Sequence, residues 1–197
     1  MGKGRVEAFS DGVIAIIITI LVLELKVPHG TEFSALMPLI PAFVSYVLSF
    51  IYLGIYWNNH HHLLQAASHV NGLVLWANLH FLFWLSLIPF VTGWMGENEF
   101  GTLPVAVYGF DFLMAALAYY LLERSLIAAQ GEGSRLKMAV GAEIKGWVSV
   151  VFYIAGILAA LFWTPWVGLG LYGFVALMWL VPDRRIERAL ARSTPTE

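Results

Sequence analysis

The 197-residue sequence contains no cysteine, which excludes disulfide bonds and metal sites built from thiolates. Charged residues are also scarce: Asp, Glu, Lys and Arg make up 12% of the chain, whereas a typical soluble domain has about 25%. The net charge of -2 carries no signal for an anionic partner such as nucleic acid. These scarcities disfavour a soluble enzyme, a nucleic-acid-binding protein and a disordered chain.

Apolar residues are correspondingly abundant, at 59%, and the mean hydropathy is +0.75. A chain this short does not bury so much apolar surface in a water-facing globule. A helix needs about 20 apolar residues to cross a bilayer, and six such runs follow one another, at 9–25, 36–57, 73–95, 104–122, 146–163 and 165–181. The sequence therefore predicts an all-α polytopic membrane protein with six transmembrane helices, the last two forming a hairpin.

Lysine and arginine are unevenly distributed over the predicted loops. Cytoplasmic loops of membrane proteins carry an excess of both residues. With the N-terminus inside, ten of the eleven basic residues face the cytoplasm, and Lys26 alone lies outside. The pattern predicts that both termini are cytoplasmic. Lys3 and Arg5 ahead of an apolar core also fit a signal peptide, although no small-residue cleavage site follows.

Two polar residues, Ser10 and Asp11, immediately precede the longest apolar part of the first run. An oxygen of either side chain would accept hydrogen bonds from the first backbone N–H groups of a helix beginning at Gly12 or Val13. A carboxylate also suits the positive end of a helix dipole. The sequence therefore predicts an N-cap at this point.

Three consecutive histidines, at 60–62, follow Trp57 near the cytoplasmic end of the second run. Successive side chains on a helix are about 100° apart, so these three do not bind one ion from a single helix. We expect them to form hydrogen bonds to neighbouring helices, with no bound cofactor. A metal or haem site that adds His69 and His80 is the alternative.

Asp111 interrupts the fourth run, where a charged carboxylate costs roughly 3 kcal/mol. An ionisable residue inside a membrane span is a functional hypothesis by default. The sequence identifies no partner for it. A secondary cation or proton transporter that uses Asp111 and the histidines is therefore one interpretation, although the repeated halves of many transporters are not apparent.

The first run carries a stripe of residues on one helical face. At about 100° per residue, Gly12, Ile16, Thr19 and Leu23 fall within about 60° of one another, and Ile20 lies at the edge. Ordinary helix packing explains such a stripe, with Gly12 permitting close approach. A stripe that faces a pore is the other interpretation.

The first run also resembles a known signature. Arg5, the segment Phe9-Ser10-Asp11-Gly12-Val13 and the following Ala15-Ile16 and Thr19-Ile20-Leu21 are similar to the first helix of the TMEM175 family of potassium channels. Trp57 with His60-His61-His62, and then Asn78 with Ser86-Leu87-Ile88-Pro89-Phe90, resembles the second and third helices. Six spans match one family repeat, as in the prokaryotic members, which assemble as tetramers.

The resemblance implies a channel and not an enzyme: a cell-membrane homotetramer that conducts K⁺ and other monovalent cations through a pore lined by the first helix. The predicted spans and the basic residues that follow them divide the chain into a six-span channel domain, 1–182, and a basic cytoplasmic tail, 183–197. The family lacks the TVGYG filter of other potassium channels, and so does this chain. Ile16 matches the main apolar constriction, Ile20 and Leu23 match further apolar layers, and Thr19 matches a hydroxyl layer associated with selectivity.

The remaining motif residues correspond to a packing and hydrogen-bond network that holds the first helix against the second. Its members are Arg5, Phe9, Ser10, Asp11, Trp57, His60, His61 and His62. An apolar constriction makes it costly for an ion to lose water, so the pore either widens and carries hydrated ions or stays dry and closed. Potassium is less tightly hydrated than sodium, and we therefore expect modest selectivity for potassium.

Overall fold

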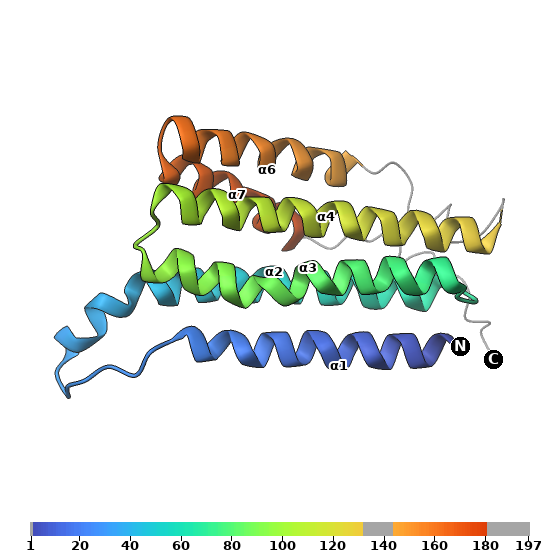
Figure 1. The fold of residues 1–197 in the computed structure, drawn as a ribbon, viewed down its shortest axis with the longest axis horizontal. Coiled ribbons are helices and arrows are strands. Elements are labelled where there is room, and N and C mark those ends of the chain that lie inside the picture. Colours follow the sequence, from blue (N-terminus) through green and yellow to red (C-terminus); the bar gives the residue numbers. More distant parts are fainter. Residues whose placement is uncertain (1, 132–143, 181–197) are drawn as a thin grey trace, which may run out of the picture.

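Long apolar segments fold into helices because a backbone inside a bilayer must satisfy its own hydrogen bonds. The computed structural model describes residues 2–131 and 144–180, and these form an all-α bundle (Figure 1). Its α-helices are α1 (Lys3–Leu21), α2 (Ile40–Ala66), α3 (Gly72–Glu97), α4 (Thr102–Gln130), α6 (Ile144–Phe162) and α7 (Pro165–Leu180). The short 3₁₀ helices η1 (Val22–Glu24) and η2 (Phe33–Leu39) lie between α1 and α2.

The predicted all-helical membrane fold is confirmed. Five helical segments in the described ranges are long and apolar enough to cross a bilayer, and α7 is a shorter apolar helix of 16 residues. The predicted hairpin of the last two runs is also present, because α6 and α7 pack together across a turn at residues 163–164. The predicted tail at 183–197 and the end of the predicted channel domain lie outside the described residues.

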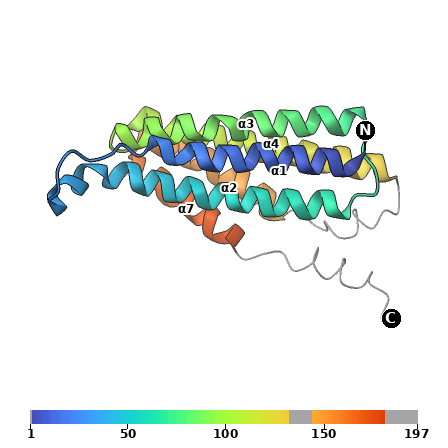
Figure 2. The same ribbon diagram turned by 90° about the horizontal axis from the view of Figure 1, so that it is seen from below.

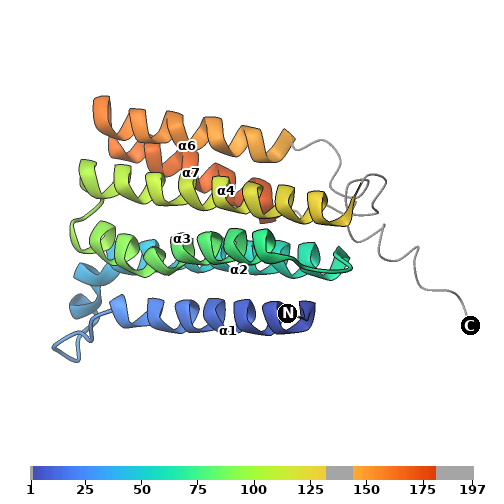
Figure 3. The ribbon, with the colours of Figure 1, turned by 45° about the vertical axis from the view of Figure 1, so that its right-hand side comes forward.

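The helices alternate in direction and stack in layers (Figures 1 and 3). α1 packs on α2 and α3 at one edge of the bundle, α4 packs on α3, and the α6–α7 hairpin covers α4. The start of α1 and the end of α4 therefore lie at one end of the bundle. The α1–α2 linker and the α6–α7 turn lie at the other end, which we call the outer end.

Aromatic side chains fill the core between α2, α4, α6 and α7. The rings of Tyr52 and Phe112 are 4.2 Å apart between centroids, and both side chains are buried. Tyr172 of α7 lies against Gly109 and Gly156, where a methyl group on either glycine would overlap its ring. Glycine at these two positions therefore lets α7 approach α4 and α6 closely.

The predicted N-cap at Ser10 or Asp11 is wrong. α1 begins at Lys3, with Gly2 at the N-cap position, so both residues lie inside the helix. Lys3 helps to fix this first turn, because its ammonium donates hydrogen bonds to the carbonyl oxygens of Gln65 and Ala67, at 2.9 and 2.8 Å. Polar residues 10 and 11 have partners on neighbouring helices, and an interrupted helix is not needed to satisfy them.

Candidate ion pathway and its supporting network

One face of α1 is left uncovered by the rest of the subunit. The buried residues of α1 form a stripe toward α2 and α3, consisting of Val6, Ser10, Ile14, Ile17 and Leu21. The five stripe residues Gly12, Ile16, Thr19, Ile20 and Leu23 are all exposed, Ile16 by 58% and Leu23 by 74%. The view in Figure 2 shows α1 lying between α3 and α2. The uncovered face of α1 is thus mainly aliphatic, with a single hydroxyl.

That hydroxyl belongs to Thr19, and its proton is already used. Thr19 Oγ1 donates to the carbonyl oxygen of Ile16, one turn earlier, at 2.8 Å. A hydroxyl has one proton to donate and two lone pairs that accept. Thr19 therefore presents lone pairs to the uncovered face, which is the polarity that a cation requires.

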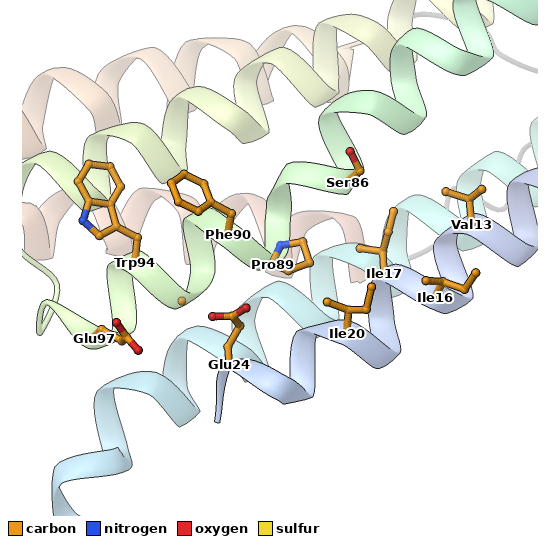
Figure 4. Close-up of a pocket in the computed structure, with 11 residues that line it drawn as sticks. Val13, Ile16, Ile17, Ile20, Glu24, Ser86, Pro89, Phe90, Trp94 and Glu97 are labelled. Atoms are coloured by element: carbon orange, nitrogen blue, oxygen red, sulfur yellow. The ribbon is translucent and has the colours of Figure 1, made fainter. Parts of the chain in front are cut away.

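A groove of about 770 Å³ runs beside this face, between α1 and α3. Figure 4 shows its two walls. The lining residues are Val13, Ile16, Ile17, Ile20 and Glu24 on one side and Ser86, Pro89, Phe90, Gly93, Trp94 and Glu97 on the other. We call this feature the α1–α3 groove; it is apolar along most of its length and acidic at its outer end.

The two carboxylates at the outer end have different surroundings. Glu24 turns toward α3 and lies against Gly93, where a side chain as small as a methyl group would collide with its carboxylate. Glu97 forms an ion pair with Lys26, whose ammonium donates a hydrogen bond to its carboxylate at 2.6 Å. This hydrogen bond, and then the charge of Glu97, raise the pKa of Lys26. The exposed pair contributes little stability, but it ties the α1–α2 linker to the end of α3.

Near the middle of α1, a hydrogen bond joins α1 to α2. The indole Nε1–H of Trp57 donates to Oδ1 of Asp11 at 3.0 Å. Nearby, Nδ1 of His61 lies 3.3 Å from a carboxylate oxygen of Glu7. Both contacts connect α1 to the segment of α2 that starts at Trp57, the first through the motif residue Asp11 and the second through Glu7, which the predicted set omits.

Asn78 of α3 is the centre of a buried network that joins three helices. Its Nδ2 donates to Ser10 Oγ at 2.9 Å, and Ser10 Oγ in turn donates to the carbonyl oxygen of Val6 at 2.8 Å. Its Oδ1 is 2.8 Å from Nε2 of His60, which must therefore carry the proton. Ser10, His60 and Asn78 are all buried. The predicted set of site residues omits Asn78, although an amide within an apolar run was the available signal.

The structure does not bring every motif residue into this network. Arg5 and Phe9 are exposed on α1, and no hydrogen bond or ion pair joins the Arg5 side chain to the described residues. Nδ1 of His62 is buried without a hydrogen-bond partner in the described ranges. Within those same ranges, no group of three or more acidic, histidine or cysteine residues is arranged to hold a metal ion.

Asp111 lies apart from the histidines, inside the subunit. It is 2% exposed, and neither carboxylate oxygen has a hydrogen-bond partner among the described residues. Thus the described part of the chain shows no hydrogen-bonded path between Asp111 and the residue 60–62 segment. A buried carboxyl group without a partner is costly when charged.

Comparison with known proteins adds independent information. The family model "Endosomal/lysosomal potassium channel TMEM175" matches residues 5–89. The chain is 55% identical over 190 residues to a potassium channel of Chryseobacterium sp. (strain P1-3), covering 96% of this chain and 98% of that protein. It is 32% identical over 158 residues to a potassium channel of Streptomyces collinus (strain DSM 40733 / Tue 365), covering 71% and 77%.

The fold also matches a solved structure. The crystal structure of a lysosomal potassium-selective channel TMEM175 homolog from Chamaesiphon minutus superposes with a TM-score of 0.78. The sequence identity is 25%, and the match covers 91% of this chain and 96% of the other.

Proposed function

The chain belongs to the TMEM175 family and is a multi-pass cation channel, and on this premise we propose that it conducts K⁺ through a pore surrounded by the α1 helices of four subunits. One helix does not enclose a pore, so the pathway requires an oligomer. The four-fold number follows from the resemblance to the prokaryotic, single-repeat members of the family.

The uncovered face of α1 is the observation that carries this proposal. Ile16, Thr19, Ile20 and Leu23 are exposed in the isolated subunit, while Ile14 on the opposite side is completely buried. Four copies of α1 with this face toward a common axis would produce successive rings of side chains. The rings would be aliphatic at Ile16, Ile20 and Leu23 and hydroxyl-bearing at Thr19.

The ring at Ile16 supplies the proposed gate. Four isoleucines offer water no hydrogen bonds, and narrow hydrophobic constrictions close by losing their water. An ion passes only when the ring widens enough to admit part of its hydration shell. Conduction and the width of this ring are therefore coupled.

Thr19 supplies the proposed selectivity for potassium over sodium. Its lone pairs, held outward by the hydrogen bond to Ile16, replace some of the water oxygens that an ion loses at the constriction. Potassium holds its water less tightly and therefore loses less on entry. Four hydroxyl groups replace fewer ligands than a cage of backbone carbonyls, so the selectivity is modest.

The contacts of Ser10, Asp11, Trp57 and His60 support a scaffold role. Ser10 and His60 hold α1 against α3 and α2 from the buried side of α1, through Asn78, and the bond between Trp57 and Asp11 ties α2 to α1 beside the uncovered face. The hydrogen-bonding atoms of these residues have partners within the subunit. In this account they fix the direction of the pore face without binding ions.

We assign the protein to the cell membrane with both termini in the cytoplasm. The basis is the excess of lysine and arginine in the loops at the end where α1 starts. Lys26 and its partner Glu97 then lie at the extracellular end.

A reversal-potential measurement tests the function. The purified protein is inserted into a planar bilayer that has KCl on one side and NaCl at the same concentration on the other. We expect a tetramer whose current reverses toward the potassium equilibrium potential, with a measurable sodium permeability. A current that reverses toward the sodium equilibrium potential, or a monomer that still conducts, contradicts the proposal.

One observation favours a second candidate, a secondary cation or proton transporter. Asp111 is a buried carboxyl group without a hydrogen-bond partner in the described ranges, as expected of a site that binds and releases a cation. Flux through a transporter is limited by turnover and saturates, whereas a channel gives unitary current steps. Single-channel recording separates the two candidates.

A further inference from the structure

The α1–α3 groove shares residues with the proposed pore face. Ile16 and Ile20 belong both to the uncovered stripe of α1 and to the lining of the groove. The groove therefore opens beside the axis around which the four α1 helices stand. In a closed ring of subunits, the molecule next to this position is another copy of the chain.

An exposed surface made by α1 and α2 lies on the other side of α1. On α1, exposed side chains recur every seven residues at Ala8, Ala15 and Val22. The adjoining edge of α2 has the same spacing, with exposed aromatic rings at Phe43, Phe50 and Trp57. Residues seven apart lie on nearly the same helical face. We call this surface the α1–α2 flank. It combines a flat strip of small α1 side chains with protruding α2 rings.

We infer that the α1–α3 groove of each subunit holds the α1–α2 flank of the next subunit, an assignment that rests on the four-subunit pore proposed above. α1 lies between α3 and α2 (Figure 2), so each subunit presents the groove on one side of the pore face and the flank on the other. Rotation about a four-fold axis brings the flank of one copy to the groove of its neighbour. Such a heterologous contact closes a ring.

The depths of the two surfaces in the membrane agree. Within one subunit, Ser49 Oγ of α2 and Thr92 Oγ1 of α3 are 2.7 Å apart, which places Phe50 near the level of Phe90. A four-fold axis along the membrane normal leaves every residue at its own depth. Phe50 of one subunit therefore meets the groove of the next near Phe90, and Val47 meets it near Trp94.

Side-chain size supports the same arrangement. Ala8 and Ala15 leave room for close approach between helices, which is how helices associate in lipid where no hydrophobic force drives them together. The groove wall at Pro89 and Phe90 is apolar and receives an aromatic ring without an unpaired polar group. The acidic part of the groove lies farther out, at Glu24 and Glu97.

Cysteine cross-linking tests this interface, because the chain has no cysteine of its own. The double variant Phe50→Cys with Phe90→Cys is oxidised in the membrane and run on a denaturing gel without reductant. We expect a ladder of disulfide-linked dimers, trimers and tetramers that collapses with reductant. Each single variant, and the control pair Phe50→Cys with Leu158→Cys on the exposed face of α6, should remain monomeric on the gel.

The outcome separates this interface from the pore itself. If the parent protein is a conducting tetramer and the Phe50–Phe90 pair yields only monomers, the groove has another occupant, such as lipid, and the inference is wrong. If the parent forms no tetramer, the proposed function fails instead. Should the double variant not assemble, Val47→Cys with Trp94→Cys tests the same contact farther out, and monomers from that pair in an intact tetramer would equally overturn it.

Discussion

Trp57 of α2 donates its indole N–H to the carboxylate of Asp11 on α1, at 3.0 Å, and this bond joins the two helices near the middle of α1. A hydrogen bond to a charged group at a partly exposed site contributes about 1 kcal/mol. Together with the Asn78 network, it sets the rotation of α1 about its own axis. The rotation decides which side chains the helix presents to the proposed pore.

Removing this bond should weaken the assembly and leave selectivity unchanged. We expect Asp11→Ala to lower the free energy of unfolding of the purified oligomer by about 1 kcal/mol and to leave the reversal potential unchanged. Trp57→Phe removes the donor of this bond and keeps an aromatic ring. The double variant should therefore lose no more stability than Asp11→Ala alone. An Asp11→Ala tetramer of normal stability that no longer prefers K⁺ would identify Asp11 as an ion site.

Asn78→Leu should be more damaging than Asp11→Ala. It leaves Ser10 Oγ without its donor and His60 Nε2 without its acceptor in a buried position, at about 1–3 kcal/mol for each unpaired group. Thermal unfolding in mild detergent measures the loss. His80→Leu, at an exposed polar side chain on the same helix and outside the α1–α3 groove, is the matched control and should have little effect. Equal stability of the two variants would remove Asn78 from the scaffold.

Thr19→Val should reduce selectivity without opening the gate. Valine keeps the shape of threonine, but it removes the lone pairs that the exposed face offers to an ion. The measured K⁺-to-Na⁺ permeability ratio should fall toward one, while the open probability stays near that of the parent. An unchanged ratio would place ion discrimination outside the Thr19 layer.

Asp111→Asn separates the channel from the transporter. Asparagine has nearly the shape of aspartate and carries no exchangeable charge, and the described residues provide no partner that the change would disrupt. We expect unitary conductance and reversal potential to match those of the parent. Loss of transport with normal assembly would favour a cation or proton pathway through Asp111.

The fold was largely predictable because each membrane span is a continuous run of apolar residues, which the local sequence shows directly. The first boundary was not, because Ser10 and Asp11 have the chemistry of an N-cap but find their partners on α2 and α3. Similarly, no local pattern shows that Asn78 lies opposite both Ser10 and His60, since that depends on the register of three helices. The uncovered stripe of α1 could be predicted from the sequence, because helical periodicity alone places Ile16 and Thr19 on one face.

The most direct measurement compares the currents of Ile16→Asn and Ile18→Asn in the same bilayer. Ile16 is on the uncovered face of α1, whereas Ile18 is partly buried away from it. Asparagine at position 16 would wet the constriction and offer oxygen ligands. The account predicts a larger current and a smaller K⁺-to-Na⁺ permeability ratio for Ile16→Asn, and a permeation pattern like that of the parent for Ile18→Asn. Equal changes in permeation at the two positions would mean that α1 presents a different face, and would contradict the pore described here.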